Sequence, residues 1–260
     1  MSPYIRYDLD GGIATITIDR AEKKNAMTYA MLGEFIEAVA RAGADAQARV
    51  LIVTGVPGAF CAGTDLADLA TVPGAERGLR GGAEERERWW PLVACPKPVI
   101  AAVDGPAVGM GAEFTSQCDI RLATPNARFA WNFAHRGLVP DTGAGSWLLP
   151  RLIGPSRALR LLYTGEFLSA EAALEIGYVD ELVAPESLMA KARELAGAIL
   201  RGSPFSHARI KNLVYEGLGS SVAEHMPRHT DALAACFKSH DHQEGVAAFL
   251  ERREANFTGI

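Results

Sequence analysis

The sequence has few cysteines, no long apolar run and no excess of positive charge. Its four cysteines are widely spaced and form no C-x-x-C pair, a pattern typical of free thiols in a reducing compartment. With 26 Lys and Arg against 31 Asp and Glu, the formal charge of −5 gives no basic surface for nucleic acid. No stretch approaches the roughly 20 apolar residues of a membrane span, and residues 1–10 lack the apolar core of a signal peptide. We therefore expect a cytoplasmic protein without a nucleic-acid or membrane partner.

Motifs typical of metal and redox chemistry are also missing. His225 and His229 have the i, i+4 spacing of a helical zinc site, but they enclose Pro227 and lack the glutamate of a zinc-protease helix. The turn at 109–111 lacks the later glycine of a dinucleotide fingerprint, and Ser146 does not lie in a G-x-S-x-G elbow. We expect no metal and no bound cofactor.

What the sequence does contain is an alternation of strands and helices, in a chain of 260 residues that is long enough for one large core. Apolar residues alternate over 5–9 and 13–18 around a glycine turn, which predicts a β-hairpin. A helix capped by Thr28 and a buried strand at 50–54 follow. A further strand, glycine turn and helix occupy 98–117. This order favours an α/β fold with a parallel sheet.

The C-terminal part of the chain has a different pattern. A last strand-like run covers 178–183, and after the Gly-Ser-Pro sequence at 202–204 the pattern is helical through Arg253. We predict an α/β core over residues 1–200 that contains the active site, and a helical C-terminal region over 201–260 that serves oligomerisation.

Two glycine-bearing turns lead from a strand into a helix, at 59–66 and at 104–113. Such turns expose free backbone N–H groups, and two helix N-termini that meet could direct two amides at one developing oxyanion. Each turn alone is weak support, because glycine turns before helices are common in α/β proteins and most of them bind nothing.

The two turns together resemble those of the enoyl-CoA hydratase/isomerase family, also called the crotonase family. The resemblance runs nearly from end to end and includes further segments at 19–26, 97–105, 137–140, 168–173 and 249–257. It implies a spiral of β-β-α units followed by a C-terminal helical trimerisation region. It also implies an enzyme that acts on acyl-CoA, with coenzyme A as part of the substrate, and a homotrimer or a dimer of trimers.

The resemblance also implies which side chains carry protons. Glu113 matches the first of the two glutamates of the family's hydratases, whereas the position of the second falls on Phe133, which cannot carry a proton. Asp141 matches a third acidic position that serves as proton carrier in some family isomerases. Glu113 and Asp141 are therefore the candidate acid-base pair. Without catalysis, Glu113 would be an acid favoured by a helix N-terminus, and Asp141 an N-cap for the helix after Gly143.

The remaining site residues come from the same resemblance. The backbone N–H groups of Thr64 and Met110 would form the oxyanion hole. The residues implied for coenzyme A are Lys24, Ala26, Ala62, Asp65, Leu66, Phe249 and Arg252, the last reaching over from a neighbouring subunit. The residues that would wall an acyl pocket are Leu69, Trp89, Trp131 and Phe133. The alternative for the charged residues is a solvated surface, and for the large apolar residues an ordinary place in the core.

Because Phe133 removes one of the groups that hold water in a hydratase, we expect isomerisation of an enoyl double bond in preference to hydration. The alternatives are an enoyl-CoA hydratase proper and a non-catalytic acyl-CoA-binding or RNA-binding member of the fold, since a fold alone does not determine function.

Overall fold

The computed structural model describes residues 4–71 and 90–260. It has two β-sheets, and the larger one begins with the predicted hairpin. Strands β1 and β2 pair antiparallel around Gly11 and Gly12, which both have positive φ angles. The strands are β1 (Ile5–Asp10), β2 (Ile13–Ile18), β3 (Val50–Gly55), β4 (Val99–Val103), β5 (Pro106–Val108), β6 (Ile120–Ala123), β7 (Arg128–Ala130), β8 (Leu168–Ser169) and β9 (Glu181–Leu182).

The larger sheet has six strands in the order β1-β2-β3-β4-β6-β9. From β2 onward every neighbouring pair is parallel, as the alternation of strands and helices predicts. The smaller sheet has the order β5-β7-β8. Its first strand, β5, leads directly into helix α5, so this sheet positions the N-terminus of that helix.

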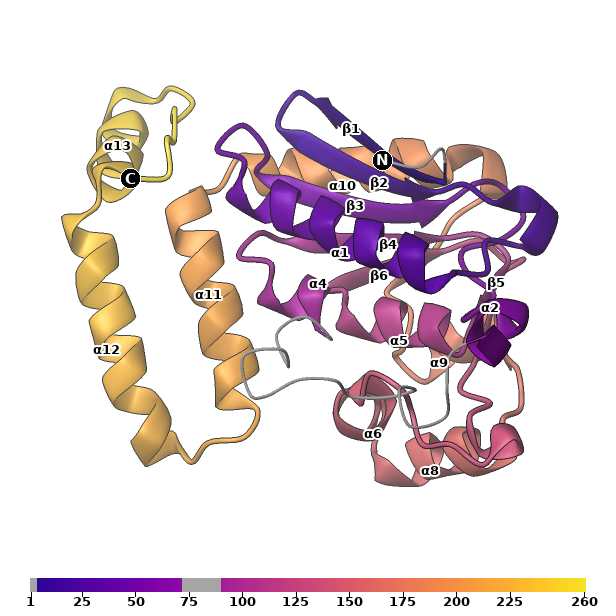
Figure 1. The fold of residues 1–260 in the computed structure, drawn as a ribbon. Coiled ribbons are helices and arrows are strands. Elements are labelled where there is room, and N and C mark those ends of the chain that lie inside the picture. The colour runs from indigo at the N-terminus through magenta and orange to yellow at the C-terminus, as the bar shows by residue number, and fades with distance from the viewer. Residues whose placement is uncertain (1–3, 72–89) are drawn as a thin grey trace.

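Helices cover both faces of the larger sheet (Figure 1). The described α-helices are α1 (Tyr29–Ala44), α2 (Leu66–Thr71), α4 (Pro91–Ala94), α5 (Met110–Gln117), α6 (Ala144–Trp147), α7 (Leu149–Ile153), α8 (Pro155–Thr164), α9 (Ala170–Glu175), α10 (Leu188–Leu200), α11 (Pro204–Gly217), α12 (Val222–Lys238) and α13 (His240–Glu251). Short 3-10 turns occur at Ala21–Lys23, Ala134–Arg136 and Pro185–Ser187. No helix of the described chain is long and apolar enough to cross a membrane.

Two apolar cores lie on the two faces of the sheet. The larger one joins α1 and α5 to the sheet, where the rings of Phe35 and Phe114 lie 4.7 Å apart. The smaller one joins α10 to the opposite face through Leu188, Ala192 and Ala196. Helix α1 begins where the sequence predicts, because the Thr28 side chain accepts a hydrogen bond from the N–H of Met31.

The predicted strand at 178–183 is shorter in the structure, where β9 covers only Glu181–Leu182. Tyr178 instead enters the core and is fully buried. Its hydroxyl lies 2.7 Å from the Thr115 hydroxyl and 3.0 Å from that of Ser116, both on α5. These hydrogen bonds satisfy the buried phenol, so Tyr178 serves the core rather than a strand.

Helices α11, α12 and α13 project to one side of the α/β part (Figure 1), in agreement with the predicted helical C-terminal region. Helix α11 is tied to the core by Lys211, which is only 6% exposed. Its ammonium group lies 3.0 Å from the Asp119 carboxylate and donates to the carbonyl oxygens of Leu92 and Lys97. A buried charge with these partners fixes where the helical region leaves the sheet. The division at residue 200 stays a prediction.

Candidate active site

The two glycine turns of the sequence meet beside the smaller sheet. Cys61 and Ala107 form a parallel bridge, in which the Cys61 N–H donates to the Pro106 carbonyl oxygen and the Val108 N–H donates to that of Cys61. Gly111 is required for this approach, since a Cβ there would lie 2.2 Å from the Cys61 carbonyl oxygen. The bridge holds the N-terminus of α5 against the turn that precedes α2.

The two predicted oxyanion donors lie next to each other in this arrangement. A Cβ placed on Gly63 would be 3.7 Å from the Met110 nitrogen, so the peptide that carries the Thr64 N–H borders the start of α5. Within the described part of the chain, neither the Thr64 N–H nor the Met110 N–H has a hydrogen-bond partner. The Met110 side chain is buried in the core. Two adjacent unpaired donors can stabilise a negative oxygen.

Glu113 lies in the first turn of α5, and its side chain is completely buried. The Thr142 hydroxyl donates to its Oε2 atom at 2.6 Å. Its Oε1 atom has no hydrogen-bond partner among the described residues and faces Gly145, where a Cβ would lie 2.4 Å away. Burial raises the pKa of this carboxyl to about 8, and the charge of Asp141 raises it further, whereas the Thr142 hydroxyl and, more weakly, the nearby backbone N–H groups of Gly145 and Ala144 lower it.

Asp141 lies on the loop that precedes α6, and it does not cap that helix. The N-cap of α6 is Gly143, and no side chain caps it. The Ala144 N–H donates instead to the Thr142 hydroxyl. The alternative of an N-cap role for Asp141 is therefore wrong. The Oδ1 atom of Asp141 is buried and unpartnered within the described chain, and burial raises the pKa of the carboxyl to about 6.

The two carboxyls have raised but separated pKa values. At pH 7 a carboxyl of pKa about 6 is mainly ionised and can accept a proton, whereas one of pKa about 8 is mainly protonated and can donate one. Burial is the largest cause of the raised pKa of both carboxyls. The nearby Cys61 thiol stays neutral, since burial raises its pKa to about 12. The arrangement can therefore move protons near neutral pH.

Of the predicted acyl-pocket residues, Phe133 lies near the N-terminus of α5 and Trp131 lies near the Glu113 carboxyl. Phe133 is buried, and its ring lies 3.8 Å from the position of a Cβ on Gly109, the residue that precedes Met110. Trp131 is fully buried, and its ring approaches the same point beside Gly145 as the Glu113 carboxyl does. It also packs edge-on against Tyr178. Leu69 is half-buried on α2, and Trp89 lies outside the described residues.

Two of the residues implied for coenzyme A, Asp65 and Ala26, contact the side chain of Arg20, a residue for which the sequence predicted no role of its own. Its guanidinium pairs with the Asp65 carboxylate at 2.8 Å and donates to the Ala26 carbonyl oxygen at 2.9 Å. The Ala62 N–H donates to the Lys24 carbonyl oxygen, so the two loops lie side by side. The hydrogen bond from Arg20 lowers the pKa of Asp65. Leu66 follows at the start of α2 and is exposed.

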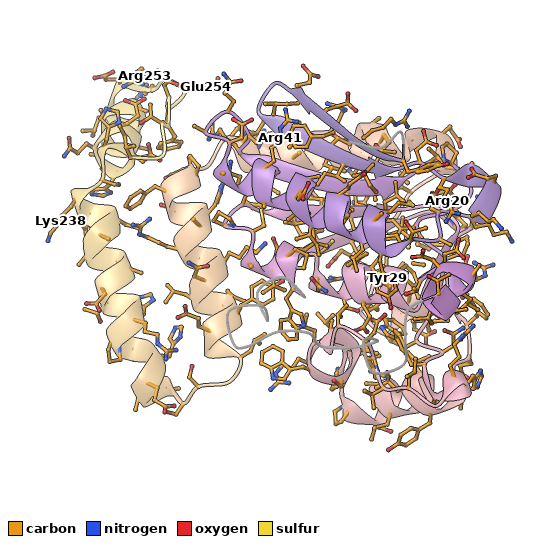
Figure 2. The ribbon with its side chains drawn as sticks, in the orientation of Figure 1. Arg20, Tyr29, Arg41, Lys238, Arg253 and Glu254 are labelled. Atoms are coloured by element: carbon orange, nitrogen blue, oxygen red, sulfur yellow. The ribbon has the colours of Figure 1, made fainter. Side chains whose placement is uncertain are left out.

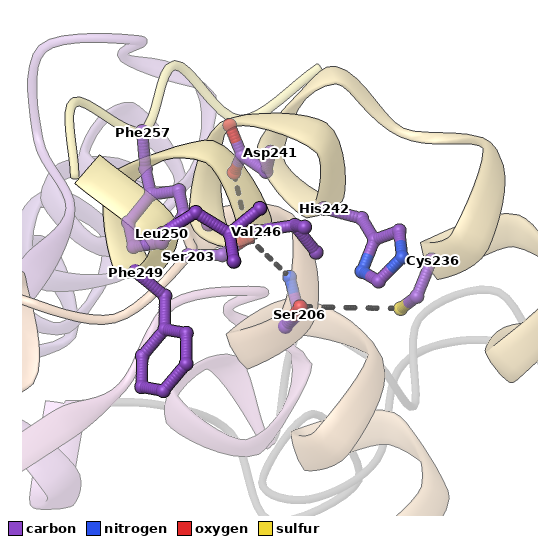
Figure 3. A pocket seen from close by; sticks show the side chains of 10 residues that line it. Ser203, Ser206, Cys236, Asp241, His242, Val246, Phe249, Leu250 and Phe257 are labelled. Carbon is purple, nitrogen blue, oxygen red and sulfur yellow. Dashed lines mark hydrogen bonds between the residues drawn. The ribbon is translucent and has the colours of Figure 1, made fainter. Parts of the chain in front are cut away.

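Phe249 and Arg252 lie far from these loops within one chain. Figure 2 shows Arg253, the neighbour of Arg252, and Arg20 at opposite ends of the molecule. Phe249 is 82% exposed at the edge of a cavity of about 380 Å³ among α11, α12 and α13 (Figure 3). A single chain therefore does not bring these two residues to the predicted site, and their contribution from a neighbouring subunit stays a prediction.

Sequence reasoning missed residues that act through hydrogen bonds to distant partners. Asn25 is buried and donates to the carbonyl oxygens of Ala59 and Phe60, which holds the turn before α2. Thr142 binds Glu113, and Trp90 donates its indole N–H to the Thr142 carbonyl oxygen at 2.7 Å. For Asn25 the residue type itself was a signal, because asparagine is enriched at turn positions with a positive φ angle, and Asn25 adopts one. Spacing along the chain gives no signal for the other two.

Comparison with known proteins agrees with this fold. A family model described as enoyl-CoA hydratase/isomerase matches residues 8–259. The chain is 36% identical to a crotonyl-CoA hydratase of Syntrophomonas wolfei, covering 94% of each protein, and 35% identical to a 1,2-epoxyphenylacetyl-CoA isomerase of Escherichia coli, covering all of both. The crystal structure of an enoyl-CoA hydratase from Bacillus anthracis is similar with a TM-score of 0.91 and 30% identity, over 99% of this chain and 100% of that one.

Relatives that match nearly the whole chain are named as enoyl-CoA hydratases and isomerases, so the class of this protein is that of an enzyme rather than of a binding module. The chain belongs to the enoyl-CoA hydratase/isomerase family. The predicted resemblance, fold class and enzyme class are all confirmed.

Proposed function

We propose that this enzyme holds the carbonyl oxygen of an acyl-CoA thioester between the N–H groups of Thr64 and Met110, and moves a proton on the adjacent carbons. The observation that carries the proposal is the burial of Glu113 and Asp141 beside these donors, each with an unpartnered oxygen. Burying two unpaired carboxyl oxygens is costly, and such groups gather at functional sites. Polarising the carbonyl makes the neighbouring C–H acidic, because the charge of the enolate falls on the held oxygen.

The chemistry that we favour is migration of an enoyl double bond. Asp141, ionised at neutral pH, removes a proton from the carbon between the carbonyl and the double bond of a 3-enoyl-CoA, and a dienolate forms. Return of the proton to the γ-carbon gives the 2-enoyl-CoA, so one base serves both steps. Neutral Glu113 donates a hydrogen bond or proton within the site. Phe133, whose ring lies near Gly109, falls by the sequence resemblance on the position of the second glutamate of the hydratases, so it cannot help to hold a water.

Hydration is the second candidate, because one relative with 36% identity is named as a crotonyl-CoA hydratase. A water would then attack the β-carbon of a 2-enoyl-CoA with Glu113 as the main proton carrier.

In water enriched in oxygen-18, the wild-type enzyme should convert a 3-enoyl-CoA to 2-enoyl-CoA faster than labelled 3-hydroxyacyl-CoA appears. Asp141→Asn should reduce this isomerisation at least ~100-fold, the usual scale of acid-base catalysis, and Glu113→Gln should reduce it less. Rapid formation of labelled hydroxyacyl product that depends chiefly on Glu113 would mean a hydratase.

Substrate binding and assembly complete the proposal. Lys24 supplies a cation for the phosphates of coenzyme A from the loops around Arg20, and Arg252 supplies another from a neighbouring subunit of a homotrimer or a dimer of trimers. Support for assembly comes from α11, where Ile210 and Val214 are each 57% exposed in a single chain. Apolar side chains on one helical face are typical of a surface that another subunit covers. A cytoplasmic location remains a prediction from the cysteine spacing.

A further inference from the structure

The Thr142 side chain has a fixed hydrogen-bonding direction. Its oxygen accepts a hydrogen bond from the Ala144 N–H at 3.3 Å, so its own proton is free to donate to Glu113 Oε2 at 2.6 Å. The other end of the residue is held as well, because the Trp90 indole N–H donates to the Thr142 carbonyl oxygen at 2.7 Å. The Trp90 ring in turn packs against Trp147, with ring centroids 5.3 Å apart.

A buried carboxylic acid must carry its proton on one of two oxygens, and its action depends on which one. The Thr142 hydroxyl already donates to Oε2, so Oε2 serves as the acceptor and the proton of the neutral acid belongs on Oε1. Oε1 is the atom without a partner in the described chain, and it lies on the side of Gly145 and Trp131. The hydroxyl is thus the only side-chain hydrogen-bond donor to this carboxyl within the described chain, and it favours one rotation of the carboxyl and one place for its proton, beside the weaker effect of the Gly145 and Ala144 N–H groups.

We propose that Thr142, anchored by Trp90, is a positioning residue that orients the Glu113 carboxyl for proton transfer. This inference rests on the proposed function of the site, in which Glu113 takes part as an acid. Nearby titratable groups do not replace Thr142 in this role. Asp141 acts on Glu113 through its charge, and Cys61, on the turn before α2, stays a neutral thiol. The hydroxyl favours the ionised form of Glu113 against burial and the charge of Asp141.

The test uses Thr142→Val, which keeps the shape but removes the hydroxyl, and Thr142→Ser, which restores it. Ser146→Ala is the matched control: its hydroxyl donates to the Gly143 carbonyl oxygen in the same segment. The pKa of Glu113 is measured in the substrate-free protein by carbon-13 NMR of labelled glutamate carboxyls, and the signal is assigned by its loss in Glu113→Gln. Thr142→Val should raise this pKa by about one unit, since a hydrogen bond to a charged group is lost. Thr142→Ser and Ser146→Ala should leave it near the wild-type value.

Turnover provides the second readout. In Thr142→Val, kcat for the enoyl-CoA substrate should fall about tenfold with KM nearly unchanged, and Thr142→Ser should recover most of it. An unchanged Glu113 pKa, or a changed pKa with unchanged kcat, would overturn the positioning role. If Thr142→Val does not fold, Trp90→Phe removes the anchoring N–H and should raise the same pKa by a smaller amount; no change would again overturn the role. The two proposals can fail separately. If the Glu113 pKa rises in Thr142→Val but the wild-type protein turns over no enoyl-CoA, Thr142 still orients the Glu113 carboxyl, and the proposed function is refuted.

Discussion

Glu113→Gln should make the folded protein more stable at neutral pH while it impairs the enzyme. In the folded chain, the pKa of Glu113 is raised from 4.5 to about 8 by burial, so the folded state binds this proton more tightly than the unfolded state does. The stability due to this group is therefore fully present below about pH 4.5 and is lost as the pH rises through 8. Glutamine keeps the shape and an oxygen that accepts from Thr142, but it has no proton to lose.

The size of the effect follows from the difference between the folded and unfolded pKa values. A difference of one unit between these two pKa values corresponds to about 1.4 kcal/mol, so between pH 5 and pH 8 the wild-type protein should lose about 3.5 kcal/mol that Glu113→Gln does not lose. This is a large fraction of the roughly 5–15 kcal/mol that stabilises a typical domain. The quantity to measure is the difference in unfolding free energy between the two proteins, which removes the pH dependence that they share.

Urea unfolding at several pH values and at one fixed protein concentration measures this difference, because assembly makes stability depend on concentration. The matched control is Glu186→Gln, which changes an exposed carboxyl on a surface turn and should alter stability little at any pH. A difference between Glu113→Gln and wild type that stays constant from pH 5 to pH 8 would refute the argument. It would mean that Glu113 is not held neutral by its burial.

Three further predictions concern the donors, the carboxyl site and the assembly. Thr64→Ala retains the amide and should change turnover little, whereas Thr64→Pro removes it and should reduce kcat ~100- to 1,000-fold; equal activities in two folded variants would exclude this donor. Gly145→Ala places a Cβ 2.4 Å from the Glu113 carboxyl and should reduce kcat at least ~10-fold, whereas Gly197→Ala, with open space around it, should not; equal kcat values would contradict the packing. Light scattering at micromolar concentration should give a trimer or a multiple of it, and a monomer would exclude the intersubunit role of Arg252.

The sequence predicts the parts of this structure that depend on local patterns. The hairpin, the start of α1 at its Thr28 cap and the helical region after 204 all follow from alternation, capping residues and apolar periodicity. The strand predicted at 178–183 is wrong at its start, because the periodicity of a short apolar run does not distinguish a strand from a core segment. Tyr178 is held in the core by hydrogen bonds to α5, which lies more than 60 residues earlier in the chain.

The sequence and its resemblance name candidate site residues, but they do not give the chemical environment of those side chains. Local reasoning gave Asp141 a capping role, since an acid before a helix is often an N-cap. The structure gives the local hydrogen bond to Thr142 instead and leaves Asp141 buried. Its burial depends on segments that lie far from it in the sequence, and so does the ion pair between Arg20 and Asp65, which are 45 residues apart. Spacing along one chain cannot reveal such contacts.

The order of the two pKa values follows from how deeply each carboxyl is buried, and it is the basis for the roles that we propose for them. Glu113 is completely enclosed on α5, whereas Asp141 lies on a loop and keeps part of its surface exposed, so burial disfavours the charge of Glu113 more strongly. Ionisation of Asp141 then raises the pKa of Glu113 further, which widens the gap between them. The pair therefore loses its first proton mainly from Asp141, and removing that charge in Asp141→Asn should lower the pKa of Glu113. Exchanging the two acids between the positions would not exchange this order, because the environment of each position, rather than the residue type, determines which carboxyl is the base.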